Sequence, residues 1–390
     1  MLRHAQRVIA LVPIAIAVSV VIAVAGVAGL GSSSARQIGH AASAVGHSSS
    51  KTSIIAQAKA AVVKDEAPWT AAEIGFPKTS PPAAKHIFLV SVSCGQQIEG
   101  CRSISDAQIQ AAKAIGWKTQ QIDGAGSPAG WNTAVSQAIG LHPQVLAFGG
   151  AAPSAVGGLL KEAHSKGIVV VCTTCGGQSG VDGVDYDNGD ADISDKVGAY
   201  SANYVLSKAG TKADTLILNY PELGGAIIRV NAFKQVYDKC SACKSMVINV
   251  STSEWGTTLP GRLESILQQN PKINWIFNPA DETAIDSVNA IHAAGLVGKV
   301  FAIGGNGELQ SYQRVREDPT YAAVPGASYY FAGWQAIDGA NRILHHQQPV
   351  AVNMPVRLFT QSNVSVVPVG QYWSTGVNFR GIYEKLWGVK

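Results

Sequence analysis

From residue 86 onward, short apolar runs alternate with amphipathic segments of helical period. The first run, IFLVSVS at residues 87–93, is strand-like, and SDAQIQAAKAIGW at 105–117 has helical spacing with Asp106 in its first turn. Near-continuous apolar strands separated by helices are typical of a parallel sheet covered on both faces. Further strands are expected at 118–123, 144–150 and 168–174, and further helices at 131–141 and 153–167. This alternation predicts an α/β fold.

The alternation stops at residues 175–195, CGGQSGVDGVDYDNGDADISD, and then begins again. In the second series, strands are expected at 213–219, 244–251, 273–279 and 299–305, and helices at 226–239, 259–270 and 282–295. Residues 322–344 add a strand and a long helix. Two series of similar length predict two doubly wound αβα lobes with parallel sheets. Such sheets bind ligands beyond the carboxyl ends of their strands, so the predicted site is a cleft between the lobes.

The N-terminal part of the chain differs in composition. Residues 8–30, VIALVPIAIAVSVVIAVAGVAGL, carry no charge and follow the basic leader MLRHAQR. We expect residues 1–35 to be a signal peptide or a membrane anchor, and the chain to be exported to the periplasm or to the outer face of the cytoplasmic membrane. Residues 36–85 are expected to form a linker or arm, on which Trp69 and Phe76 could dock against the body.

Composition narrows the class of protein. The sequence is 46% hydrophobic and 14% charged, with 41 glycines, which fits a globular α/β protein. The net charge is +4, and no cluster of basic residues is present, so we expect no nucleic-acid partner. The membrane is expected to be contacted only through the N-terminal segment, and the protein to be a monomer.

The six cysteines form three close pairs: Cys94 with Cys101, Cys172 with Cys175, and Cys240 with Cys243. In an exported chain an even number of cysteines favours disulfides. Each of the two C-x-x-C motifs is also compatible with a zinc site or a redox-active thiol pair, so a thiol oxidoreductase is an alternative function.

Catalytic motifs are missing from the sequence. It contains no H-E-x-x-H, no G-x-S-x-G and no phosphate-binding loop. We therefore expect no enzymatic activity, no cofactor and no metal site.

Five segments, in this order, carry a family resemblance: VLAFGGAAPSAVGGLLKEAHSKGIVVV, RVNAF, IFNPADETAIDSVNAIHAAG, VFAIGGNGE and GWQAIDGANRIL. Over residues 86–362 the chain resembles the type I periplasmic solute-binding proteins of ABC transporters, and among them the ribose-binding kind. The resemblance implies two lobes joined by a three-stranded hinge, with the ligand trapped as the lobes close. It places the N-lobe at residues 86–185 and 328–356, the C-lobe at 186–327 and 357–390, and the crossings near 186, 327 and 357.

The resemblance also assigns ligand-binding residues in the C-lobe. Arg229 matches a family arginine, whose planar fork can donate to two ligand oxygens. Trp255 lies near a family aromatic residue that can stack on a sugar. Asn306 replaces a family aspartate. Asp281 matches a family acid, but a helix N-cap is an equal alternative, and the adjacent Glu282 is interpreted as a first-turn residue favoured by the helix dipole.

The N-lobe and the crossings supply the remaining candidates, which are Gln96, Gln97, Thr174, Asp187, Ser328 and Tyr329. Several of these replace the sugar-gripping residues of the family, so ribose itself is not the expected ligand. We expect a small polar ligand, a sugar or polyol and preferably a neutral one, that is delivered to an ABC transporter permease. A membrane-tethered ligand-sensing domain is the alternative.

Overall fold

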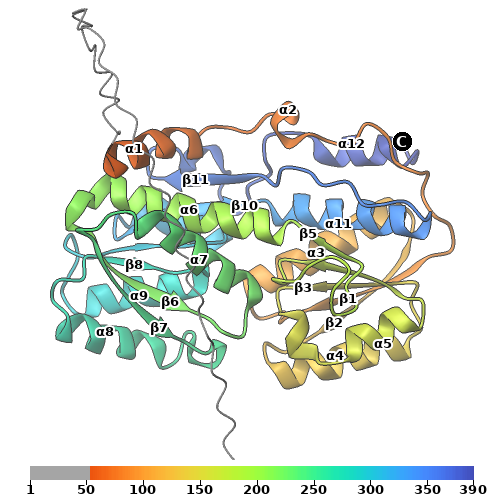
Figure 1. The fold of residues 1–390 in the computed structure, drawn as a ribbon, viewed down its shortest axis with the longest axis horizontal. Coiled ribbons are helices and arrows are strands. Elements are labelled where there is room, and N and C mark those ends of the chain that lie inside the picture. The colour runs from red at the N-terminus through yellow and green to blue at the C-terminus, as the bar shows by residue number, and fades with distance from the viewer. Residues whose placement is uncertain (1–52) are drawn as a thin grey trace, which may run out of the picture. The chain divides into compact units, whose positions relative to one another are not determined.

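The computed structural model describes residues 53–390. The predicted signal peptide or anchor at residues 1–35 lies outside this range, as does the beginning of the predicted linker. Within residues 53–390, no helix is both long and apolar enough to cross a membrane. Figure 1 shows two α/β lobes, each built around its own sheet.

The N-lobe contains a five-stranded parallel sheet in the order β2-β1-β3-β4-β5. Its strands are β1 (Phe88–Ser93), β2 (Lys118–Asp123), β3 (Val145–Gly149), β4 (Val169–Thr173) and β5 (Tyr186–Asn188). Its helices are α3 (Glu99–Ala114), α4 (Pro128–Gly140), α5 (Leu159–Ser165) and α11 (Tyr329–Leu344), and a short 3-10 turn covers Pro153–Val156.

Consecutive residues of β3 explain why this sheet needs helices on both faces. Val145 and Ala147 belong to the core shared with α3 and α11, whereas Leu146 and Phe148 belong to the core shared with α4 and α5. All five residues of β3 are buried. An apolar run without alternation is therefore stable only between two helical layers, as the sequence predicts.

The C-lobe contains a six-stranded sheet in the order β11-β10-β9-β8-β6-β7. Its strands are β6 (Asp214–Asn219), β7 (Lys244–Asn249), β8 (Trp275–Phe277), β9 (Phe301–Ile303), β10 (Tyr321–Ala327) and β11 (Val356–Thr360), of which β11 is antiparallel to β10. Its helices are α6 (Asp190–Ala209), α7 (Gly224–Tyr237), α8 (Leu259–Gln269), α9 (Asp281–Ala293) and α10 (Leu309–Glu317). Short 3-10 turns cover Gly210–Lys212, Thr252–Glu254 and Val364–Val366. The predicted fold class is confirmed.

Strands β5 and β11 and helices α6 and α10 are not among the elements expected from the sequence, and α3 begins earlier than expected. Helix α6 is additional: it packs against both α7 and α1 (Ile54–Asp65), so its apolar residues face two sides and form no single stripe. Helix α10 was not predicted either. Its sequence is mostly polar and only Ser311, Tyr312 and Val315 are buried, so it shows too few apolar residues to reveal a helical period. Helix α3 begins at Glu99, six residues before the expected position.

The chain passes between the lobes three times. It leaves β5 for α6 at Gly189, leaves β10 for α11 at Ser328, and returns to β11 after Pro355, whose carbonyl accepts a hydrogen bond from the Ser328 amide at 3.3 Å. Gly189 has a φ of 73°, and a side chain there would overlap Met354. The crossings therefore pack on one another, close to the positions that the resemblance implies.

Residues 53–85 are packed rather than extended. The indole Nε1 of Trp69 donates to the Val356 carbonyl at 2.8 Å, and the Phe76 ring lies edge-on to Phe331 with centroids 5.8 Å apart. Helix α2 (Ala71–Ile74), between them, begins with a capping box formed by Thr70 and Glu73. The part of the predicted linker that the structure describes is thus docked on the body through the two aromatic residues named from the sequence.

The C-terminal helix α12 (Phe379–Leu386) packs on the N-lobe. The Phe379 ring lies edge-on to Phe331, and Trp387 stacks on Trp334 of α11 at 5.4 Å. The expected division assigns residues 357–390 to the C-lobe, and it differs from the observed packing at this end. The reason is that aromatic residues at helical spacing find their apolar partner in α11.

We predict that Trp387→Ala lowers the free energy of unfolding by about 3–5 kcal/mol, because it removes a large side chain that is only 1% exposed. Chemical denaturation measures this change. As the control, Val369→Ala removes methyl groups from a residue that is 80% exposed. Equal stability of the two variants would show that α12 does not contribute to the N-lobe core.

Candidate functional site

A cavity of about 60 Å³ lies between the lobes, at the carboxyl ends of both sets of strands. Its N-lobe wall includes Cys94 after β1 and Thr174 after β4, and its C-lobe wall includes Tyr220 after β6 and Asn306 after β9. This is the edge at which parallel α/β sheets bind ligands. The cleft predicted from the sequence is therefore present.

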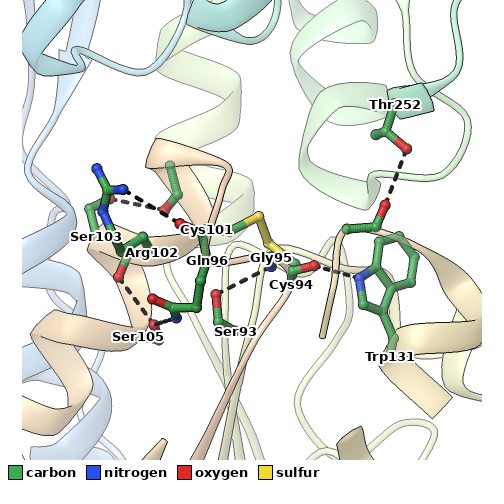
Figure 2. The surroundings of a disulfide bond; sticks show 12 residues. Ser93, Cys94, Gly95, Gln96, Cys101, Arg102, Ser103, Ser105, Trp131 and Thr252 are labelled. Atoms are coloured by element: carbon green, nitrogen blue, oxygen red, sulfur yellow. Dashed lines mark hydrogen bonds between the residues drawn. A yellow bond between two sulfur atoms is a disulfide. The ribbon is translucent and has the colours of Figure 1, made fainter. Parts of the chain in front are cut away.

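A disulfide between Cys94 and Cys101 forms part of the N-lobe wall (Figure 2). It joins the residue that follows β1 to the first turn of α3, and the Trp131 indole Nε1 donates to the Cys94 carbonyl at 2.7 Å. This link explains the early beginning of α3: Cys101 and Ile104 are buried at helical spacing, but Cys101 was expected only as a disulfide partner.

The other two expected disulfides, Cys172–Cys175 and Cys240–Cys243, are also present. Residues 53–390 contain no free cysteine and no group of three or more His, Cys, Asp or Glu residues placed to hold a metal ion. The structure therefore gives no support to a zinc site or a free thiol pair at the C-x-x-C motifs.

Arg229 extends from α7 into the cavity wall and binds two other predicted site residues. Its Nη1 donates to the Pro279 carbonyl and to Asn306 Oδ1, both at 2.5 Å, and its Nη2 donates to the Tyr329 hydroxyl at 2.9 Å. The Tyr329 hydroxyl in turn donates to Asn306 Oδ1 at 2.8 Å. Since Tyr329 begins α11 directly after a crossing, this network connects the C-lobe wall to the hinge.

Asp281 has a different role from both of the roles expected for it. Its carboxylate accepts backbone N–H groups from four consecutive residues, 305–308, at 2.7–3.0 Å, and it accepts the Tyr321 hydroxyl at 3.1 Å. The N-cap of α9 is Ala280, and Asp281 is fully buried outside the cavity lining. Its carboxylate therefore fixes the loop that presents Asn306 and Glu308.

The structure distributes the remaining predicted residues as follows. Thr174, Trp255 and Tyr329 line the cavity with Arg229 and Asn306, whereas Gln97 lines an outer groove. Gln96 is turned away, because its Nε2 donates to Ser105 Oγ at 3.1 Å, as Figure 2 shows.

Asp187 and Ser328 also lie outside the cavity lining. Asp187 accepts the Gly177 amide at 2.9 Å and lines a separate hollow beside the hinge, and Ser328 is buried at the second crossing. Strand position predicts which residues reach the rim, but not the direction in which their side chains turn.

Three glutamates at the lobe interface were not predicted as site residues. Glu99 of the N-lobe accepts the Leu309 amide of the C-lobe at 2.8 Å. Glu308 accepts Asn306 Nδ2 at 2.9 Å, and Glu282 lines the cavity. The adjacent acids Asp281 and Glu282 at a strand end were the sequence signal from which Glu282 could have been predicted as a site residue. Glu99 could not be placed at the interface because the helix that contains it was expected to begin later.

Burial raises the pKa of two of these carboxyl groups. The pKa of Glu282 rises to about 7 because burial disfavours its charged form, and the negative charges of Asp281 and Glu99 add to this effect. The pKa of Glu308 rises well above its usual value for the same reasons, burial first and Glu282 second. Both oxygens of Glu282 are shielded from solvent and have no partner at normal hydrogen-bond geometry among the described residues, and the nearby Glu308 carboxyl offsets part of the rise in the Glu282 pKa.

An outer groove of about 720 Å³ adjoins the cavity. The cavity and the groove share Ile98, Trp255 and Glu282 in their linings. The Trp255 ring packs against Tyr220 with centroids 5.0 Å apart, and its Nε1 is buried without a hydrogen-bond partner among the described residues. Trp255 and Glu282 therefore stand where the cavity opens into the groove.

Direct contacts between the lobes show that the cleft is closed. The Leu309–Glu99 hydrogen bond crosses it, and Thr252 Oγ1 reaches the Gly126 carbonyl at 3.5 Å (Figure 2). The backbone at Gly176, after β4, lies directly against Gly224 at the start of α7, where a side chain on either residue would overlap the other segment. Two α/β lobes, three crossings and a cavity lined by both lobes at the strand ends define a hinged binding protein.

Residues 91–348 match the family model described as periplasmic binding protein domain. The match spans more than half of the chain, so the chain belongs to this family. No curated protein sequence matches the chain.

Solved structures show the same fold. A solute-binding protein of an ABC transporter from Agrobacterium vitis, with bound allitol, is 19% identical with a TM-score of 0.65 and covers 72% of this chain and 98% of its own. One from Mycobacterium smegmatis, with bound glycerol, is 19% identical with a TM-score of 0.61 and coverages of 74% and 98%. The myo-inositol-binding protein from Caulobacter, bound to myo-inositol, is 17% identical with a TM-score of 0.63 and coverages of 73% and 97%.

We predict that Glu282→Gln increases the free energy of unfolding at pH 8 by an amount on the order of 1 kcal/mol, and therefore raises the melting temperature. The folded-state pKa of about 7 exceeds the ordinary value of 4.5, so the folded protein binds the extra proton and this group destabilises it as the pH rises from 4.5 to 7. The variant lacks that part of the pH dependence.

Melting temperatures between pH 4.5 and 8 measure this effect. Glu162→Gln, which neutralises an exposed carboxylate on α5, is the control and should follow the wild type. A Glu282→Gln protein that melts below the wild type at pH 8 would contradict the assigned environment of Glu282.

Proposed function

We propose that this chain is an extracytoplasmic solute-binding protein of an ABC transporter, which binds a small polar ligand, a sugar or polyol, between its lobes and delivers it to a permease. The observation that carries the proposal is the cavity at the strand ends, which lies between the two lobes and is lined by residues that include Arg229, Asn306 and Trp255. The structural relatives with bound allitol, glycerol and myo-inositol support this ligand class. Because these relatives include ABC transporter components, transport is favoured over the sensing alternative.

The mechanism follows from the contacts across the cleft. A ligand that touches both lobes stabilises the closed arrangement relative to the open one by the difference between its affinities for the two states. The rotation is absorbed at the three crossings, near Gly189, Ser328 and Pro355. Arg229 and Tyr329 couple the wall of the site to the second crossing, so a ligand that engages this network acts on the hinge directly.

A thermal-shift screen over sugars, polyols and small acids tests the proposed function. Binding to the folded state alone raises the melting temperature by mass action, and a ligand at 100 times its Kd adds about 2.7 kcal/mol. We expect at least one sugar or polyol to raise it. A complete panel without effect would contradict the proposed ligand class.

We further predict that Gly224→Ala abolishes ligand-induced stabilisation while both lobes remain folded. A methyl group at this position would overlap the Cys175 carbonyl in the closed state, and opening of the lobes would relieve the overlap. The readout is the melting temperature with and without a ligand from the screen.

The matched control is Gly261→Ala on α8, where a methyl group meets no atom within 4 Å. It should keep the full ligand-induced shift. If Gly224→Ala shows the same shift as this control, closure of the Gly176–Gly224 contact is not part of binding.

A further inference from the structure

The interlobe cleft has an excess of acidic side chains. The residues that line the cavity and the outer groove include Glu222, Glu282 and Asp286, and Arg229 is the single basic residue among these described lining residues. The cleft therefore has a negative potential that low-dielectric walls concentrate.

Two further carboxyl groups face Glu282 from behind the lining. Glu99 approaches from α3 of the N-lobe and acts on Glu282 as a like charge, and Glu308 approaches from the loop before α10, where the charge of Glu282 raises its pKa. Asp281, the adjacent acid, accepts four backbone N–H groups and raises the pKa of both Glu282 and Glu308. Closure of the lobes brings Glu99 of the N-lobe up to the acids of the C-lobe, which is unfavourable unless protonation or a positive charge that enters with the ligand offsets the repulsion.

Glu282 shows where that positive charge would be bound. Both of its oxygens are buried without a partner among the described residues, although a buried carboxylate requires hydrogen-bond donors and a counter-charge. The nearby Trp255 indole Nε1 is a buried donor that also lacks a partner there. A neutral hydroxyl could donate one hydrogen bond to Glu282, but the charge would remain uncompensated. An ammonium group supplies both donors and charge.

We propose that the ligand of this site is a polyhydroxylated molecule that carries a protonated amino group, with the ammonium bound by Glu282 and a hydroxyl oxygen bound by the Trp255 indole N–H. This inference rests on the proposed function and sharpens its ligand class, since a neutral sugar or polyol is replaced by an amino sugar or amino polyol. The outer groove, continuous with the cavity at these two residues, holds the remainder of the ligand.

Matched pairs of probes test this inference on the full-length protein. Each pair differs by one hydroxyl-to-amine exchange: glucose and glucosamine, galactose and galactosamine, mannose and mannosamine, and sorbitol and glucamine. Titration calorimetry at pH 7.5 measures both members of each pair. We expect an amino member to bind at least ten-fold more tightly than its neutral counterpart, which corresponds to 1.4 kcal/mol.

The variant Glu282→Gln should reduce this preference to about two-fold or less, because it keeps the shape of the side chain and removes its charge. Glu162→Gln on the exposed face of α5 is the control and should leave the preference unchanged. Circular dichroism confirms that each variant is folded.

The outcomes separate the inference from the proposed function. Neutral members that bind as tightly as their amino counterparts overturn the inference and leave the proposed function intact. Binding by no amino member also overturns the inference, and if the neutral sugars and polyols fail as well, the proposed function is overturned with it. A preference that survives in Glu282→Gln shows that another group binds the ammonium.

Discussion

The carboxylate of Asp281 organises the site through its bonds to four consecutive backbone N–H groups. These bonds hold residues 305–308 in one conformation. The loop then presents Asn306 to Arg229 and Tyr329, places Glu308 beside Glu282, and directs the Leu309 amide across the cleft to Glu99. A buried charge that receives several N–H donors is stabilised in place, so one side chain fixes the wall of the cavity, its link to the hinge and its contact with the other lobe.

This arrangement connects local structure to movement. Each sheet is packed against helices, so we expect the lobes to move as units and the rotation to occur mainly at the three crossings. The surfaces that meet on closure consist of two kinds of contact. Gly176 and Gly224 allow the backbones to approach closely, and burial of Glu282 and Glu308 disfavours their charged forms, a cost that the proposed ligand would offset.

The sequence predicts the frame of the molecule well. Apolar runs that alternate with helical segments are sufficient for two doubly wound lobes, since such runs are stable only inside covered parallel sheets. Helix α6 is not predicted from the pattern because it is buried on two sides and has no single apolar stripe. Helix α10 is not predicted because it is mostly polar. The packing of α12 on the N-lobe depends on contacts with α11, far away in the sequence.

The site is predicted less completely, for a physical reason. Strand ends determine which residues reach the rim, and Arg229, Trp255, Asn306, Thr174 and Tyr329 do line the cavity. The direction of a side chain depends on hydrogen-bond partners elsewhere in the chain. Gln96 donates to Ser105, and Asp281 accepts N–H groups from a loop that begins 24 residues later in the sequence. Glu99 becomes a neighbour of Glu282 only when the lobes close, and Glu308 is brought beside Glu282 by the loop that Asp281 holds, so no local pattern reveals either contact.

The central claim is that a small polar solute holds the two lobes together around this cavity. Small-angle X-ray scattering of the protein, with and without a compound that raises its melting temperature, tests it most directly. The account predicts a smaller radius of gyration with the compound than without it. Identical scattering curves for a compound that demonstrably binds would contradict closure as the mechanism.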